Sequence, residues 1–599
     1  MRKNSTYKIL VLRRKINFME KTVLTGKPSI DRPWMKFYPP QMIANLQVPR
    51  CTLREYLEKN MPGLDVVALH YYGDDITWRT FWENTDAVAR SLRAIGFGEG
   101  DQIPVFLRSV PEFLYLLLAA EKIGAALLCR DNTLAENVEA VMRSGAKAMI
   151  AHDFLSKEEM DAYVSQGKVE KIVLLDPCHS CDYNSLRENV QNTLDSLYPE
   201  ERASGEYTMD WDEFLALGKN YAGVVEAEEN YDRPLYCAYT SGSTGPSKQV
   251  IHSSNTMIGI VHQMNFYGAS DAFRPTWLVT ALPPCLVAVV VAMLILPLAS
   301  NKLLILDPFC DVQDVDIELM HYRPNCWPLI PMFMEIVMNS KRVPDDYDMS
   351  HLFSAGAGSE ASNNKQLRRA QQYLIDHNCK ATYTTGYGCS EAGSSVSLPM
   401  SPEPIRNGNV GIPMPLTTIS IFKPGTHEEL GYNQIGEICK TGPGNMLGYD
   451  NPEATAKALQ LHEDGNVWLH LGDLGYMTEN GVIYTLTRGE SPRFGGGELC
   501  SLPMENLIAD AEIKGIRDEF FVIIPDDEHP GYFLPYLYVV LEEGYTVDDI
   551  RDAVNATLEP HMLPVDILPI SERPFFHFKT NRIGLSRELI AARAAKKNQ

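Results

Sequence analysis

Residues 239–248 read YTSGSTGPSK, a loop in which glycines alternate with hydroxyl side chains. Such a loop exposes backbone N–H groups together with hydroxyl donors, which suits the oxygens of a polyphosphate, and Lys248 adds a positive charge. An apolar strand candidate, residues 235–239, leads into it. The spacing matches neither the Walker phosphate loop, GxxxxGK[ST], nor the dinucleotide-binding fingerprint, GxGxxG. We therefore predict phosphate binding here, with a flexible surface loop as the alternative; the residues concerned are Thr240, Ser241, Gly242, Ser243, Thr244, Gly245 and Lys248.

Short strands and helices alternate on the N-terminal side of this loop. Apolar runs predict strands at residues 66–72, 103–107, 125–129 and 148–151. Helical patterns lie between them, at residues 77–95, 111–123 and 138–144, and each is followed by a glycine that can end it. This alternation predicts the α/β class, with a mostly parallel sheet and helices on its faces.

The length of the chain requires more than one domain. A single hydrophobic core rarely serves 599 residues. Charges, proline and three consecutive glycines gather in residues 487–497, which predicts a hinge or linker. We expect an N-terminal extension at residues 1–33, a large domain at 34–486 and a small α+β domain at 487–599. The last should contain strands at 520–524 and 536–541 and a helix at 547–558.

Charge and hydropathy exclude several classes of protein. A net charge of −23 argues against nucleic acid or an anionic membrane as the main partner. The longest apolar run, residues 285–298, is shorter than the roughly 20 residues of a membrane span and contains Pro297, so we predict a buried element and no stable membrane insertion. No convincing signal peptide precedes Met19, which could itself be the start. Twelve scattered cysteines favour reduced thiols and a cytoplasmic location.

One cysteine pair has metal-ligand spacing. Cys178 and Cys181 form a CxxC motif. A closed zinc site needs four ligands, and no second pair lies nearby, so a plain loop is the favoured interpretation.

Three further segments carry residues suited to a nucleotide. In TGYGCSE, residues 385–391, the ring of Tyr387 can stack on a base, the Ser390 hydroxyl can reach a phosphate and Glu391 can hold Mg²⁺. The alternative is a glycine turn with a surface glutamate, which the segment alone would favour. In SAGAG, residues 354–358, small side chains permit close approach of the backbone or a tight turn. In WLHLGDLGY, residues 468–476, the Asp473 carboxylate can accept from a ribose diol or serve as a turn residue.

Together these segments, in this order, resemble the adenylate-forming (AMP-binding) superfamily, which includes acyl-CoA synthetases, peptide-synthetase adenylation domains and luciferases. The resemblance extends from about residue 34 to 589. The family's TSGSTGxPKG is modified here, because the proline comes one place early and Gln249 replaces the last glycine. The resemblance implies a large N-terminal domain of layered α/β subdomains, a small mobile C-terminal domain and an active site between them.

The resemblance also implies a reaction in two steps and a set of residues for it. A small carboxylic acid attacks the α-phosphate of Mg²⁺-bound ATP to give acyl-AMP, and the thiol of CoA, or a carrier-protein phosphopantetheine arm, then takes the acyl group. Domain rotation around Glu490 would separate the steps. The implied catalytic residues are Lys248, Ser390 and Glu391, and the implied Mg²⁺ ligands are Glu391 and Thr244. ATP and AMP contacts are implied for Thr240, Ser241, Gly242, Ser243, Thr244, Gly245, Lys248, Ala355, Gly356, Ala357, Gly386, Tyr387, Gly388, Ser390, Asp473 and Arg488.

Two departures from the family pattern concern catalysis. The family's lPxxH segment reads LPPCL at residues 282–286, so Leu286 stands where a histidine or aromatic is usual and makes that wall of the acyl pocket apolar. The family's PKTxxGK reads FKTNRIG at 578–584, which places Gly584 or Leu585 at the lysine position. Losing one preorganised charge can cost on the order of 10²–10³ in rate. Arg582, or Lys579, could substitute from a shifted loop.

Three functions therefore remain open. The first is an acid–thiol ligase that forms acyl-CoA. The second is a ligase-like nucleotide-binding protein with reduced or lost adenylation, and the third is an enzyme that loads a carrier protein.

Overall fold

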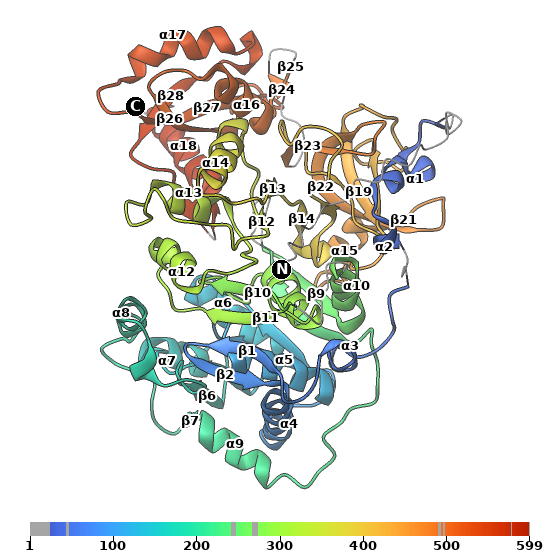
Figure 1. The fold of residues 1–599 in the computed structure, drawn as a ribbon, viewed down its shortest axis with the longest axis vertical. Coiled ribbons are helices and arrows are strands. Elements are labelled where there is room, and N and C mark those ends of the chain that lie inside the picture. Colours follow the sequence, from blue (N-terminus) through green and yellow to red (C-terminus); the bar gives the residue numbers. More distant parts are fainter. Residues whose placement is uncertain are drawn as a thin grey trace, which may run out of the picture.

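The computed structural model describes residues 24–43, 47–240, 247–265, 273–488, 493–494, 497–576 and 578–597. It has the predicted mixed α/β architecture, with a large N-terminal part and a small C-terminal part (Figure 1). Three main sheets make up the N-terminal part, and a three-stranded sheet with its helices makes up the C-terminal part.

The largest sheet carries the loop at residues 240–248. Its strand order is β20-β9-β8-β4-β3-β5-β6-β7. Strands from β7 to β8 along this order run parallel, as predicted, and β9 and β20 add an antiparallel edge. Their bounds are β3 (Gln102–Phe106), β4 (Ala126–Cys129), β5 (Ala148–His152), β6 (Lys171–Leu175), β7 (Thr208–Asp210), β8 (Pro234–Tyr239), β9 (Gln249–Ser253) and β20 (Gly448–Tyr449).

The helices of this sheet end where their glycines predict. Helix α5 (Pro111–Ile123) ends at Gly124 and α6 (Leu134–Ser144) ends at Gly145, both left-handed, with φ of 77° and 70°. Helix α6 begins four residues before its predicted start, because Thr133 and Glu136 form a capping box.

The second sheet has the order β10-β11-β1-β2, with bounds β1 (Val67–Tyr71), β2 (Asp74–Thr77), β10 (Thr276–Thr280) and β11 (Leu303–Asp307). Strand β1 was expected in the same alternating series as β3, but it pairs in parallel with β11, where Leu69 lies opposite Leu304. The apolar run after β10 forms the π-helix η3 (Val289–Ile295) and α11 (Leu296–Ala299) and is buried, as predicted. In the described part of the chain, no helix has the length and hydropathy that crossing a membrane requires.

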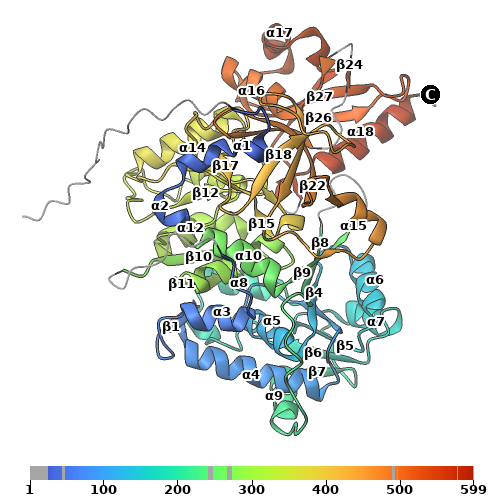
Figure 2. The ribbon, with the colours of Figure 1, turned by 90° about the vertical axis from the view of Figure 1, so that its right-hand side faces the viewer.

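The third sheet is antiparallel and carries Asp473. It contains β18 (Thr418–Phe422), β19 (Gly436–Thr441), β21 (Leu459–Leu461), β22 (Val467–Met477) and β23 (Ile483–Arg488). The N-terminal segment packs against it: the Ser29 N–H donates to the Glu429 carboxylate at 2.9 Å, and Trp34 is buried in the same core (Figure 2).

The C-terminal part packs on the large part through helix α14 (Asn364–Asp376), which lies beside α16 (Ser501–Ala511) in Figure 1. Arg368 on α14 forms an ion pair of 2.6 Å with Asp510 on α16. The remaining elements are β26 (Ile516–Pro525), β27 (Phe533–Leu541), α17 (Val547–Thr557), β28 (Asp566–Ile570), β29 (Phe575–Phe576), β30 (Lys579–Thr580) and α18 (Arg582–Lys597), and they include the strands and helix expected here.

Candidate active site

The predicted phosphate loop connects β8 to β9, and two hydrogen bonds between Thr240 and Lys248 close its base. The Thr240 N–H donates to the Lys248 carbonyl oxygen at 2.9 Å, and the Lys248 N–H donates to Thr240 Oγ1 at 3.1 Å. The predicted contacts of Ser241, Gly242, Ser243, Thr244 and Gly245 lie outside the described residues. The loop is therefore anchored between the carboxyl end of a central parallel strand and the start of its antiparallel neighbour.

Lys248 and Glu391 meet at Tyr449. The Lys248 ammonium lies 4.9 Å from the centroid of the Tyr449 ring, and the Tyr449 hydroxyl donates to Glu391 Oε1 at 2.7 Å. Pairing of β20 with β9 sets this geometry, since Tyr449 is opposite Val250. From the sequence, Tyr449 was assigned no role, and its contact with Glu391 was missed.

The backbone around Ser390 and Glu391 is held from both sides. His252 Nε2 lies 2.8 Å from the Ser390 carbonyl oxygen, and the Met446 N–H donates to the Glu391 carbonyl oxygen at 2.8 Å. Burial lowers the pKa of His252 to about 4, so its ring is neutral at pH 7. A carbonyl oxygen only accepts, so the proton of that neutral ring is on Nε2. The sequence carried no signal that singled out His252.

Tyr387 and Asp473 form a second polar pair. The Tyr387 hydroxyl donates to Asp473 Oδ2 at 2.8 Å. Asp473 follows Gly472, whose φ is 72°, where the pairing of β22 with β19 is irregular. The backbone of Arg488, on β23, lies opposite Asp473, while the Arg488 side chain lies outside the described residues. The aromatic ring predicted to stack on a base and the carboxylate predicted to take a ribose are thus in direct contact.

The small-residue segment lies next to Gly386. Residues Ala355–Ala357 form β12, which pairs in parallel with β13 (Tyr383–Thr385), and the Gly386 N–H donates to the Ala357 carbonyl oxygen at 2.7 Å. A Cβ on Gly356 would meet nothing nearer than the Thr384 hydroxyl at 3.7 Å, whereas a Cβ on Gly388 would lie 1.8 Å from the Ser394 carbonyl oxygen. Packing within the protein therefore requires glycine at position 388. At position 356 the neighbouring residues leave one face of the glycine open, so a ligand could lie close to the backbone there.

The C-terminal segment forms a helix, α18, where a loop was expected. Helix α18 begins at Arg582, so Gly584 and Leu585 are helical, and the expectation of a loop at these residues was wrong. Leu585 packs on a buried cluster that includes Phe520 and Val522, and a Cβ on Gly584 would lie 2.6 Å from the Asn581 side chain. The helix therefore directs position 585 into the C-terminal core.

Arg582 itself contacts acidic groups of both parts of the chain. Its guanidinium lies 3.1 Å from Glu360 and 2.8 Å from Glu505, and its Nε donates to the Phe521 carbonyl oxygen at 3.1 Å. The Thr580 N–H donates to the second Glu360 oxygen at 3.1 Å. Arg582 thus joins the C-terminal part to the segment that follows β12.

A cavity of about 590 Å³ opens at the carboxyl ends of β3, β4 and β5. Its lining includes Arg108, Arg130, His152, Leu282, Pro283, Pro284, Cys285 and, from the C-terminal part, Phe578. The Arg130 guanidinium lies 4.1 Å from the centroid of the Tyr239 ring, directly before the phosphate loop, and only 8% of the residue is exposed. Its Nε has no hydrogen-bond partner among the described residues. Leu286, by contrast, packs partly buried on the main core.

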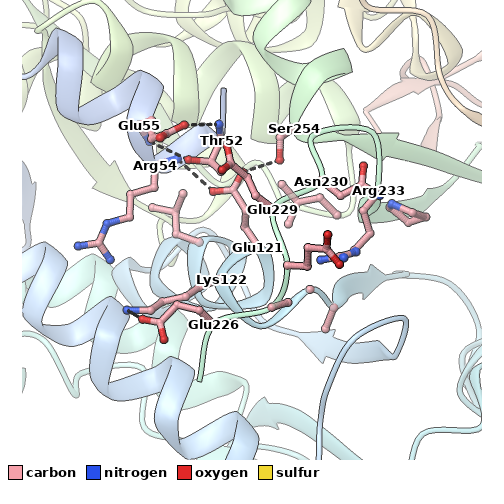
Figure 3. Close-up of a pocket in the computed structure, with 17 residues that line it drawn as sticks. Thr52, Arg54, Glu55, Glu121, Lys122, Glu226, Glu229, Asn230, Arg233 and Ser254 are labelled. Carbon is pink, nitrogen blue, oxygen red and sulfur yellow. Dashed lines mark hydrogen bonds and ion pairs between the residues drawn. The ribbon is translucent and has the colours of Figure 1, made fainter. Parts of the chain in front are cut away.

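A second pocket, of about 320 Å³, lies at the amino end of β8 (Figure 3). Glu121 in its wall accepts from the Leu53 and Arg54 N–H groups and from the Ser254 hydroxyl. Glu226 and Glu229 also line it. Because β8 separates it from Thr240 and its lining is rich in carboxylates, this pocket does not suit a polyphosphate.

Comparison with known proteins identifies the family of the chain and supports its fold. A family model described as AMP-binding enzyme matches residues 58–450. The chain is 24% identical over 496 residues to "Probable CoA ligase CCL5" of Humulus lupulus, covering 82% of this chain and 83% of that one. It is 26% identical over 491 residues to "4-coumarate--CoA ligase" of Vanilla planifolia, covering 78% and 80%. The crystal structure of ATP-bound MatB from Rhodopseudomonas palustris superposes with a TM-score of 0.71 at 18% identity, covering 90% of this chain and 99% of that chain, which supports the fold.

Proposed function

The chain belongs to the family of AMP-binding enzymes, and we propose that it activates a small carboxylic acid with ATP and passes the acyl group to the thiol of CoA. The observation that carries this proposal is the contact Lys248–Tyr449–Glu391 beside the loop that leaves the carboxyl end of β8, where ligands of such folds bind. The contact Tyr387–Asp473, which involves the third sheet, adds to it. The similarity to CoA ligases supports the choice of reaction.

In the first step a carboxylate oxygen attacks the α-phosphorus in line, and the bond to the bridging oxygen of pyrophosphate breaks. Lys248 and the loop from Thr240 to Gly245 hold the departing phosphates, and Ser390 contacts the α-phosphate. The ribose hydroxyls bind Asp473, the adenine stacks on Tyr387, and its other neighbours are Ala355, Gly356, Ala357, Gly386 and Gly388. Arg488 lies beside Asp473 on the neighbouring strand.

Glu391 fits a magnesium ligand. Mg²⁺ prefers carboxylate oxygens shared with phosphates, and the Tyr449 hydroxyl fixes the orientation of the Glu391 carboxylate. Bound there, the ion would neutralise phosphate charge during the first step. Thr244 is the second proposed ligand.

For the second step we propose CoA, because the chain is similar to proteins described as CoA ligases. The cavity at β3, β4 and β5 offers an anionic ligand one unsatisfied donor, the buried Arg130 Nε. Its charge is mixed, because Arg130 already pairs with Glu136 at 3.0 Å and the lining includes Asp131, Glu159 and Asp311 beside Arg108. A carrier protein remains the second candidate acceptor.

The C-terminal residues bear on how fast adenylation runs. Arg582 is proposed to replace the family's lysine, which requires it to leave Glu360 and Glu505. We propose that the C-terminal domain, residues 487–599, moves relative to residues 34–486 by rotation around Glu490, with residues 1–33 as an extension. The packing of Leu585 in the C-terminal core favours one alternative function, a nucleotide-binding protein with slow adenylation.

Pyrophosphate release across a panel of carboxylic acids, with and without CoA, tests the proposal. We expect release with at least one acid, formation of its CoA thioester, and loss of both in Lys248→Met. Silence across the panel, despite measurable ATP binding, would leave only the nucleotide-binding alternative. We place the protein in the cytoplasm, because all twelve of its cysteines are free thiols.

A further inference from the structure

Three side chains with metal-binding donors converge on the third sheet, from β22, which carries Asp473, and from its neighbour β19. Glu437 and Cys439 lie two residues apart on β19, and His470 on β22 is the register partner of Cys439. Their ligand atoms all lie within 4.8 Å of one another. His470 Nδ1 is 2.9 Å from Glu437 Oε2 and 3.4 Å from Cys439 Sγ. Among the described residues this is the one group of three such side chains that meets that distance, and the CxxC at 178–181 is not part of it.

We propose that Glu437, Cys439 and His470 bind a divalent transition metal ion of the zinc type, at a site separate from the proposed magnesium ligand Glu391. A thiolate, an imidazole and a carboxylate are the donors that zinc takes in proteins, and three protein ligands leave one position for water. One thiolate and one carboxylate also balance the charge of the ion, so a neutral complex forms where burial would penalise a net charge.

Neighbouring groups already orient these donors. The Gly472 N–H donates to Glu437 Oε1 at 3.3 Å, which turns Oε2 toward His470. His462 Nε2 lies 3.1 Å from His470 Nε2, so the opposite ring atom, Nδ1, faces Cys439 and Glu437. His462 is in turn stacked on His427, with 3.9 Å between ring centroids. Contacts of this kind fix the ring orientation of metal-binding histidines.

Binding replaces the S–H bond of Cys439 with a metal–sulfur bond, and the proton goes to solvent without any change of oxidation state. Because Gly472, which donates to Glu437, precedes Asp473, an occupied site would also stiffen the middle of β22; the consequence for nucleotide binding rests on the proposed function.

Cobalt(II) added to the chelator-treated full-length protein, without ATP, tests the site. We expect one equivalent to bind with a thiolate-to-cobalt charge-transfer band in the near ultraviolet, and zinc to abolish the band by displacement. Cys439→Ser should remove the band, while Cys178→Ser with Cys181→Ser should keep it. His462→Gln should weaken binding by about 10–100-fold, as loss of a supporting contact does.

The site would be overturned by absence of the band in the native protein, or by a band that survives in Cys439→Ser. Glu437→Gln provides a second variant if Cys439→Ser does not fold, and it should lower metal affinity with the band retained. Unchanged affinity in a folded Glu437→Gln protein would also refute the assignment. These readouts need no acid, ATP or CoA, so failure of the proposed ligase reaction would leave them interpretable.

Discussion

Replacing Tyr449 with phenylalanine tests whether Glu391 is a positioned magnesium ligand. The hydroxyl of Tyr449 donates to Glu391 Oε1 at 2.7 Å, and its ring lies 4.9 Å below the Lys248 ammonium. Tyr449→Phe removes the hydrogen bond and keeps the ring. The variant should therefore affect the carboxylate and leave the contact of the ring with Lys248 in place.

The size of the effect follows from that hydrogen bond. A hydrogen bond to a charged group contributes about 1.5–3 kcal/mol, which corresponds to roughly a 10–150-fold change in an equilibrium constant. We expect a decrease of this order in the apparent affinity for Mg²⁺. Tyr449→Ala should add a smaller loss, about 0.5–1 kcal/mol, because it also removes the interaction of the ring with Lys248.

Pyrophosphate release measured at increasing Mg²⁺, with ATP and acid saturating, is the assay. Tyr484→Phe is a matched control. Tyr484, on β23, makes the same kind of hydrogen bond, but it donates to the Glu403 carboxylate at 2.9 Å and not to Glu391. If Tyr449→Phe showed the same Mg²⁺ dependence as the native enzyme, the proposed role of the hydroxyl would be wrong.

Three other predictions follow from single residues. Asp473→Asn should raise the KM for ATP about tenfold or more with little change in stability, because a charged acceptor for the ribose becomes neutral; an unchanged KM would remove Asp473 from the site. Burial lowers the pKa of Lys440 to about 7 from the ordinary 10.5, so between these values the unfolded chain binds more protons than the folded one, and stability rises with pH by up to about 1.4 kcal/mol per unit. Urea unfolding at pH 7, 8 and 9 should show a smaller rise in Lys440→Met, and equal slopes would refute this. Leu585→Lys should lower thermal stability and leave adenylation no faster, since position 585 faces the C-terminal core; faster pyrophosphate release would show that a lysine there reaches the nucleotide.

Local sequence signals predicted many elements of the fold but not which sheet they join. Gly124 and Gly145 mark helix ends because a left-handed residue is needed there, and glycine adopts it without strain. The start of α6 was missed although Thr133 and Glu136 form a recognisable capping box. The pairing of β1 with β11 joins residues more than two hundred positions apart, and no local pattern specifies such a partner.

For the candidate site, the sequence predicted residue types and the structure added their contacts. Asp473 and Tyr387 were both predicted to bind the nucleotide, but no local pattern indicated the hydrogen bond between residues 86 positions apart. Tyr449 reaches Glu391 only because β20 joins the far edge of the large sheet. Arg582 was expected on a loop, yet α18 begins there and its guanidinium pairs with Glu360 and Glu505.

The formation of an acyl-adenylate is the central claim, and isotope transfer tests it most directly. A carboxylic acid that supports pyrophosphate release is labelled with heavy oxygen in its carboxyl group and incubated with ATP, Mg²⁺ and CoA. Attack of the carboxylate on the α-phosphorus, followed by cleavage of the acyl–oxygen bond by the thiol, leaves one labelled oxygen in AMP. The account predicts mass-shifted AMP in equal amount to the thioester. AMP without label, or label in inorganic phosphate, would contradict it.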